Sequence, residues 1–303
     1  MSGATLAMAM AMATSAAATI SPTSATAAAP PARMAASLPG IATTAPYDYF
    51  SGYLDAGVPP SGRGKMYLHY ICAMAPDWKK KPLTIWYNGG PGAPSTFGLF
   101  QEFGPFLLTD ESYETAEYKK TGIPTPIYNP WTWANETSLC EIDSPAPMGA
   151  SYCTEGNGSA TSHGGPSGDP YTCGPWTDKS TAAANHKAHI TLFNDAFPEF
   201  EASQQPVSLV GESYAGVYVP LFVDAWLDDP IRGPSGKLIN FKGFAIGASP
   251  PPPRSHERVR CVRMLPPTSP PKVLMRRLDL SLICRGRLPR VHPASRQANR
   301  LVR

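Results

Sequence analysis

The chain has 303 residues, 42% of them hydrophobic, which is long enough for one large α/β domain or two small ones. Its net charge of +3 hides an uneven distribution: residues 250–303 hold 13 basic and two acidic residues, whereas residues 1–249 hold 13 basic and 21 acidic ones, a net charge of −8. No stretch reaches the roughly 18 to 20 consecutive apolar residues needed to cross a bilayer, so we expect no membrane span.

Residues 1–46 differ in composition from the residues that follow them. They are rich in Ala, Ser, Thr, Met and Pro, contain no acidic residue and have Arg33 as their only basic one. Residues 6–20 are consistent with a weak secretory signal, and an organellar targeting sequence would look similar. A disordered low-complexity leader is the third interpretation. In each case we expect a leader that adds little to a folded core.

The residues after the leader predict an antiparallel start to a sheet. Strand patterns cover residues 47–53 and 65–74, with a turn rich in Gly and Pro between them. Residues 82–87 form the compact apolar run of a buried strand, which stops at Asn88-Gly89-Gly90-Pro91-Gly92, where ordinary side chains would hinder a tight turn. Another strand is predicted at residues 139–143.

Strands and helices alternate in the second half of the chain. A long loop rich in Gly and Ser at residues 153–176 precedes a helical pattern at 178–197, whose apolar residues recur at intervals of three and four. A strand at 206–210, a helix at 217–226 and a strand at 238–246 follow. Such alternation predicts right-handed crossovers and a mainly parallel sheet, an α/β-hydrolase-like arrangement with antiparallel N-terminal strands.

Four cysteines lie in the acidic body of the chain, at Cys72, Cys140, Cys153 and Cys173. Two glycosylation sequons, starting at Asn135 and Asn157, lie beside and within the Cys140 to Cys173 region. Together they favour disulfides and a secretory route, although buried free thiols remain the alternative. The sequence leaves the pairing open.

Ser213 is the candidate nucleophile. It lies in Gly211-Glu212-Ser213-Tyr214-Ala215, between a predicted strand and a predicted helix, the context in which hydrolases expose a serine on a sharp turn. The usual pattern is Gly-x-Ser-x-Gly, and Ala215 at the last position is small enough to keep the helix close to the strand. The alternative is a serine in an ordinary strand-to-helix loop.

Several motifs, in order, resemble the serine carboxypeptidase family. Gly211 to Gly216 is similar to its nucleophile motif, and Trp86 to Gly92 is similar to its Trp-x-Asn-Gly-Gly-Pro-Gly segment. The resemblance spans about residues 47–247 and implies an α/β-hydrolase fold and a serine-type exopeptidase. Further segments that resemble the family are Tyr49 to Leu54, Glu102 to Pro105, Tyr128 to Trp133 and Ile142 to Gly149.

The resemblance also implies roles for particular residues. Asn88 and Glu212 would hold the free C-terminal carboxylate of a peptide, with Glu212 protonated so that it donates a hydrogen bond. Gly90 and Tyr214 would offer backbone N–H groups to the oxyanion. Trp86 either lines the site or fills the core. The alternative for Glu212 is a carboxylate favoured by the positive end of a helix dipole.

The Asp and His of a catalytic triad are not recognisable after Ser213. In α/β-hydrolases both follow the serine, and neither His256 nor His292 lies in a strand-end loop. The Asp residues after Ser213 are Asp224, Asp228, Asp229 and Asp279. The strand at 238–246 leads directly into polyproline, so we expect a partial hydrolase domain at residues 47–249, truncated after the nucleophile helix and the next strand, and a disordered basic tail at 250–303.

No metal and no cofactor are expected. His186 and His189 are spaced like a ligand pair but have no third ligand at suitable spacing. Together with His69 and His163 they precede Ser213, and all four are interpreted as surface or packing residues.

Three functional hypotheses follow. The first is a serine-type carboxypeptidase, or an acyltransferase on the same scaffold, acting through an acyl-enzyme intermediate on peptide or protein C-termini. The second is an inactive carboxylate-binding relative or a gene-model fragment. The third, nucleic-acid or acidic-membrane contact by the basic tail, lacks aromatic or ordered support and is not adopted. We expect a vacuolar, lysosomal or extracellular location, with an organelle as the alternative.

Overall fold

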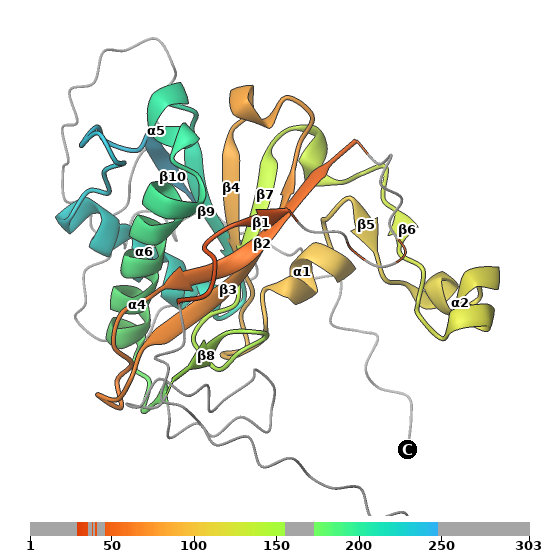
Figure 1. Ribbon diagram of the computed structural model, residues 1–303, viewed down its shortest axis with the longest axis horizontal. Helices are drawn as coiled ribbons and strands as arrows, with labels where there is room; N and C mark the ends of the chain where they lie inside the picture. Colours follow the sequence, from red (N-terminus) through yellow and green to blue (C-terminus); the bar gives the residue numbers. More distant parts are fainter. Residues whose placement is uncertain (1–28, 36–37, 39, 41–45, 155–172, 248–303) are drawn as a thin grey trace, which may run out of the picture.

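Figure 1 shows the computed structural model of the protein, which describes residues 29–35, 38, 40, 46–154 and 173–247. Several sequence predictions fall outside these ranges: most of the leader, the loop from 155 to 172 with Asn157 and His163, and the basic tail with His256, Asp279 and His292.

The core of the fold is a mixed sheet of eight strands in the order β1-β2-β3-β7-β4-β9-β10, with β8 paired to β3. The pairs from β1 to β7 are antiparallel, and those from β7 to β10 are parallel. This arrangement confirms the predicted fold class, an antiparallel start followed by a parallel, α/β-hydrolase-like core. The strands are β1 (Met34–Ala35), β2 (Asp48–Asp55), β3 (Met66–Met74), β4 (Leu83–Tyr87), β7 (Ser138–Ile142), β8 (Tyr152–Cys153), β9 (Val207–Glu212) and β10 (Phe241–Gly247).

Helices cover both faces of this sheet. Two long helices, α4 and α6, pack together on one face, whereas the short helix α1 lies on the other (Figure 1). A hydrophobic core lies on each face of the sheet. Successive side chains of β4 point to opposite faces, so Ile85 and Tyr87 pack toward α4 and α6, whereas Trp86 packs toward α1. The helices are α1 (Thr96–Gln101), α2 (Ala116–Thr121), α4 (Asp178–Thr191), α5 (Glu199–Ser203) and α6 (Ala215–Asp228).

A small second sheet, β5 (Phe106–Leu107) paired with β6 (Ile127–Tyr128), extends from the α1 side together with α2 (Figure 1). Strands of two residues are too short to show a period in sequence, so these elements were not predicted. The remaining short turns are 3-10 helices at Trp78–Lys80, Asp110–Tyr113 and Trp133–Asn135, and a π turn at Leu192–Ala196 that continues α4.

Part of the predicted leader joins the sheet. β1 pairs antiparallel with β2, and the carbonyl of Ala32 accepts a hydrogen bond from the Tyr70 hydroxyl at 2.8 Å. Arg33 pairs with Glu199 at 3.0 Å and lies over the rings of Phe50 and Phe197. Residues 29–35 therefore pack on the domain that was predicted to begin at residue 47.

Two disulfides confirm the interpretation of the cysteines as bonded rather than free. Cys72 and Cys140 face each other on the neighbouring strands β3 and β7 and are joined there. Cys153, at the end of β8, is joined to Cys173. Both bonds are consistent with the secretory pathway.

Candidate functional site

Ser213 lies on the tight turn between β9 and α6. Its backbone has a φ of 54°, in the left-handed region that a residue with a Cβ adopts only when its surroundings hold it there. Its N–H donates to the carbonyl of Gly247 and its own carbonyl accepts from the N–H of Gly216, both at 2.9 Å. The side chain is partly exposed. Ser213 therefore has the strand-to-helix turn on which hydrolases present a nucleophile.

Gly211 allows α6 to approach β9 closely. A Cβ at Gly211 would lie 2.7 Å from the Ala215 Cβ and 2.7 Å from the Tyr87 carbonyl oxygen. Because Gly211 carries no Cβ, the single methyl group of Ala215 fits at the last position of the motif. The departure from Gly-x-Ser-x-Gly is therefore compatible with the tight turn.

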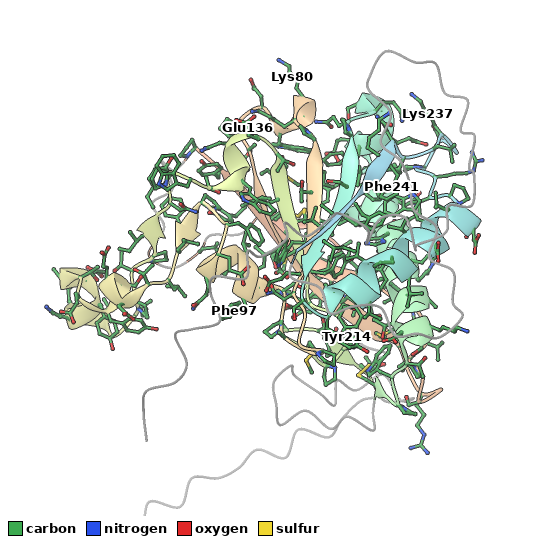
Figure 2. The ribbon with its side chains drawn as sticks, turned by 180° about the vertical axis from the view of Figure 1, so that it is seen from behind. Lys80, Phe97, Glu136, Tyr214, Lys237 and Phe241 are labelled. Atoms are coloured by element: carbon green, nitrogen blue, oxygen red, sulfur yellow. A yellow bond between two sulfur atoms is a disulfide. The ribbon has the colours of Figure 1, made fainter. Side chains whose placement is uncertain are left out.

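The Gly-rich turn after β4 lies directly against the Ser213 turn. A Cβ at Gly89 would lie 2.6 Å from the Tyr214 backbone nitrogen and 2.7 Å from the Ser213 Cβ, so only glycine fits there. Figure 2 shows Tyr214 and Phe97 at one end of the sheet and Lys80 at the opposite end. The site thus lies at the carboxyl ends of the parallel strands, where open α/β sheets bind ligands. The oxyanion role of Gly90 and Tyr214 stays a prediction.

Asn88 is held at the centre of the site. Its side-chain carbonyl accepts hydrogen bonds from the Trp86 indole N–H at 2.7 Å and from the Gly98 backbone N–H at 3.0 Å. These two bonds fix the orientation of the amide. Its NH₂ group then points to two carboxyl groups, Glu102 and Glu212, each at 3.4 Å.

Glu102, to which no role was predicted from the sequence, also lies at this candidate site. It follows the short helix α1, and burial raises the pKa of its carboxyl, with a further rise from the charge of Glu212 and an opposing effect from the Asn88 hydrogen bond. A higher pKa favours the protonated form, which can donate a hydrogen bond to an anion. Its segment, Glu102 to Pro105, is part of the family resemblance, but no sequence spacing places it beside Asn88.

Trp86 serves mainly to position Asn88. The side chain is 5% exposed and packs against Phe103, with ring centroids 4.5 Å apart, and against Trp133. Its polar atom is occupied by the bond to Asn88. The structure therefore supports the interpretation that Trp86 fills the core, whereas its role in lining the site stays a prediction.

The histidines that the structure describes have partners away from Ser213. His69 lies near Ser51 and Asp143, His186 near Asp229, and His189 near Tyr87. Among the described residues, no side-chain hydrogen bond joins a histidine to Ser213. His186 and His189 thus have different partners.

Comparison with known proteins identifies one family. The serine carboxypeptidase family profile matches residues 39–256. The chain is 31% identical to Serine carboxypeptidase 1 of Hordeum vulgare over 220 residues, which cover 73% of this chain and 38% of that protein. It is 33% identical to Carboxypeptidase Y homolog A of Talaromyces stipitatus over 198 residues, which cover 65% of this chain and 28% of that protein.

Among solved structures, a prohormone-processing carboxypeptidase from Saccharomyces cerevisiae matches with a TM-score of 0.49 and 21% identity, over 67% of this chain and 39% of that one. The chain thus spans less than two fifths of the length of each of these three relatives.

Proposed function

Because the chain belongs to the serine carboxypeptidase family, a family of serine-type hydrolases, we propose that it binds the free C-terminal carboxylate of a peptide and presents Ser213 to the last peptide bond. One observation carries the proposal: the Asn88 amide lies between the carboxyl groups of Glu102 and Glu212, on the loop that contacts the Ser213 turn.

Carboxylate recognition follows from the hydrogen-bonding capacity of these three groups. The Asn88 NH₂ group donates, and a protonated carboxyl group donates as well, whereas an ionised carboxylate would repel the substrate anion. Burial and the neighbouring charge of Glu212 raise the pKa of the Glu102 carboxyl, so Glu102 retains its proton to a higher pH. An internal peptide segment has no terminal carboxylate, and the site therefore selects chain ends.

The proposed reaction is acyl transfer to Ser213. Its Oγ attacks the carbonyl carbon of the last peptide bond, and backbone N–H groups of Gly90 and Tyr214 stabilise the oxyanion. The C–N bond then breaks, the released amino acid takes a proton, and water hydrolyses the ester left on Ser213. A general base must accept the Ser213 proton, and the proposal assigns none among the described residues.

Release of C-terminal amino acids tests this proposal. The full chain is incubated with a peptide of defined sequence, and the products are followed by mass spectrometry. We expect stepwise loss of residues from the C-terminus, with no loss by Ser213→Ala. Internal cleavage, or equal release by Ser213→Ala, would contradict the proposal.

A second candidate function is carboxylate binding without turnover. It is favoured by the partners of His69, His186 and His189, which are engaged away from Ser213. In the same experiment this candidate predicts an intact peptide that nevertheless binds through its C-terminal carboxylate.

The proposed substrates are peptide or protein C-termini in an oxidising compartment. The disulfides Cys72–Cys140 and Cys153–Cys173 support a secretory route, and we propose a vacuolar, lysosomal or extracellular location. Within the described ranges, no helix has both the length and the apolar character needed to cross a membrane.

A further inference from the structure

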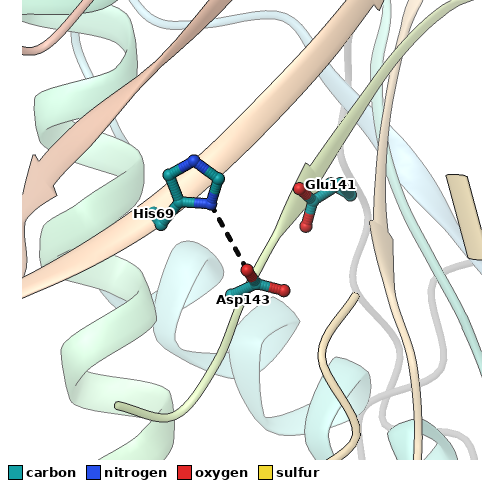
Figure 3. Close-up of side chains that lie close together, drawn as sticks. All are labelled: His69, Glu141 and Asp143. Carbon is teal, nitrogen blue, oxygen red and sulfur yellow. Dashed lines mark hydrogen bonds and ion pairs between the residues drawn. The ribbon is translucent and has the colours of Figure 1, made fainter. Parts of the chain in front are cut away.

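Three ionisable side chains outside the carboxylate site meet on the α1 face of the sheet. They are His69 on β3, Glu141 on β7 and Asp143, the residue that follows β7 (Figure 3). One ligand atom from each lies within 4.8 Å of the other two. The sheet fixes their approach, because the Asp143 N–H donates to the His69 carbonyl at 3.0 Å and β3 pairs Ile71 with Glu141.

The cluster is almost shielded from water. Glu141 is fully buried and Asp143 is 1% exposed, while the side chain of His69 is 13% exposed. His69 Nδ1 lies 3.3 Å from Asp143 Oδ2. Two neighbouring buried carboxylates repel each other and lose hydration, so the cluster is stable only with added positive charge or a shared proton.

One carboxylate oxygen lacks the partner that its burial requires. Asp143 accepts hydrogen bonds from the backbone N–H groups of Thr96 and Ala150, both at 3.2 Å. Glu141 Oε1 accepts from the Thr96 hydroxyl at 3.0 Å, but Glu141 Oε2 is buried with no hydrogen-bond partner in the described structure. Figure 3 shows this carboxylate turned toward His69 and Asp143. A buried oxygen without a partner points to a missing ligand.

The imidazole of His69 is oriented as a ligand would be. Its Nε2 lies 3.0 Å from the Ser51 hydroxyl, which can accept the Nε2 proton. In that tautomer the lone pair of Nδ1 is directed toward Asp143, 3.3 Å away. Histidines that bind metals commonly donate their other ring N–H in this way.

We propose that His69, Glu141 and Asp143 bind a divalent first-row transition-metal ion, with Zn²⁺ as the probe of choice. Imidazole nitrogen with carboxylate oxygen is a donor set that zinc accepts. Ligand atoms about 2.1 Å from a tetrahedral ion lie about 3.4 Å apart, so small rotations of Glu141 and His69 would close the cluster. The Thr96 hydroxyl is close enough to Glu141 and Asp143 to be a neutral fourth ligand.

The consequence would be structural. The ion would join β3, β7 and Thr96, the first residue of α1. Two residues further along this helix, the Gly98 N–H donates to Asn88. Metal binding would therefore stiffen the helix that orients the carboxylate site, without taking part in the reaction, and the proposal stands independently of the proposed function.

Zinc titration of the full chain tests the site. The untagged protein is treated with a chelator, dialysed and titrated with ZnCl₂ by calorimetry, and its melting temperature is measured with and without the ion. We expect zinc to raise the melting temperature and the wild type to bind one equivalent of zinc. The affinity for this ion should fall at least about tenfold in Glu141→Gln. Glu136→Gln, an exposed glutamate just before β7, is the matched control and should bind as the wild type does.

Two results would overturn the proposal. In the first, zinc leaves the melting temperature of the wild-type chain unchanged. This result would indicate that a shared proton, and not a metal, stabilises the cluster, and it does not depend on any variant folding correctly. In the second, Glu141→Gln binds zinc with the stoichiometry and affinity of the wild type, which places the ion elsewhere. Co²⁺ in place of Zn²⁺ gives a visible spectrum that should change in Glu141→Gln and stay unchanged in Glu136→Gln.

Discussion

Glu102 and Glu212 face the same amide of Asn88 at equal distances of 3.4 Å. For Glu102, burial and the charge of Glu212 raise the carboxyl pKa, so it is a natural carrier of a shared proton. A peptide carboxylate would bind best while this proton is present. Affinity should therefore fall as pH rises through the raised pKa of Glu102.

The pH dependence of binding tests this role of Glu102. In Glu102→Gln the side-chain amide donates at every pH, so the dissociation constant for a peptide with a free carboxylate should vary less between pH 4 and 8. Calorimetric titration at a series of pH values measures the effect. Glu114→Gln, an exposed residue, is the control, and an unchanged pH profile in Glu102→Gln would remove Glu102 from the recognition site.

At the residue scale, the sequence predicted the position of a residue where a local motif determines the backbone conformation. The flanking strand and helix predicted that Ser213 sits on a turn, and its φ of 54° agrees with that prediction. Glu102 has no such signal, because its position beside Asn88 depends on how α1 packs. Glu141 on β7 and Asp143 just after it received no role from the sequence, and only the pairing of β7 with β3 brings His69 beside them.

The contact between β9 and α6 depends on Gly211. We expect Gly211→Ala to destabilise the chain by about 1 to 3 kcal/mol, because the new methyl group would lie 2.7 Å from the Ala215 Cβ and from the Tyr87 carbonyl oxygen. Urea unfolding measures this free energy. Gly247→Ala is the matched control, since a Cβ there meets nothing within 4 Å. Equal unfolding midpoints for the two variants would refute the close contact.

At the element scale, long periodic segments were predictable and short ones were not. The expected strands at 82–87 and 206–210 correspond to β4 and β9, and the apolar spacing from residue 178 corresponds to α4. The small sheet of β5 and β6 is held by tertiary contacts and has no sequence period. β1 was missed because the composition of residues 1–46 indicates no core, whereas Arg33 anchors its end through Glu199.

For the whole molecule, stability in acid should depend on His189. Burial, with a smaller effect of His186, lowers the pKa of His189 to about 3. In the unfolded chain the imidazole has its ordinary pKa near 6.5, so it binds a proton at a higher pH than it does in the folded protein. The free energy of unfolding therefore decreases as pH falls below about 6.5. His189 also lies 2.7 Å from the Tyr87 hydroxyl, within the core that joins α4 to the sheet.

His189→Gln should remove this sensitivity. Between pH 6.5 and 4 the wild type should lose roughly 3 kcal/mol more unfolding free energy than the variant does, at about 1.4 kcal/mol per pH unit. Urea unfolding at several pH values measures the difference. His186→Gln, at a more exposed position on the same helix, is the control, and parallel pH profiles for wild type and His189→Gln would contradict the prediction.

The extent of the fold is also a property of the whole molecule. The sequence placed a partial hydrolase domain at residues 47–249, and the family profile matches residues 39–256. The acidic body and the basic residues from 250 onward were distinguishable by charge alone. The side-by-side arrangement of Asn88, Glu102 and Glu212 could not be predicted from the sequence, because it depends on the packing of three separate elements at one end of the sheet.

The measurement that tests the central claim most directly compares two ligands on one protein. Ser213→Ala in the full chain, which cannot turn over, is titrated with an N-blocked peptide acid and with the same peptide as its C-terminal amide. Charge-assisted hydrogen bonds from Asn88 and a protonated glutamate predict binding of the acid at least about tenfold tighter at acidic pH. Equal affinities for acid and amide would contradict the claim that this site recognises a C-terminal carboxylate.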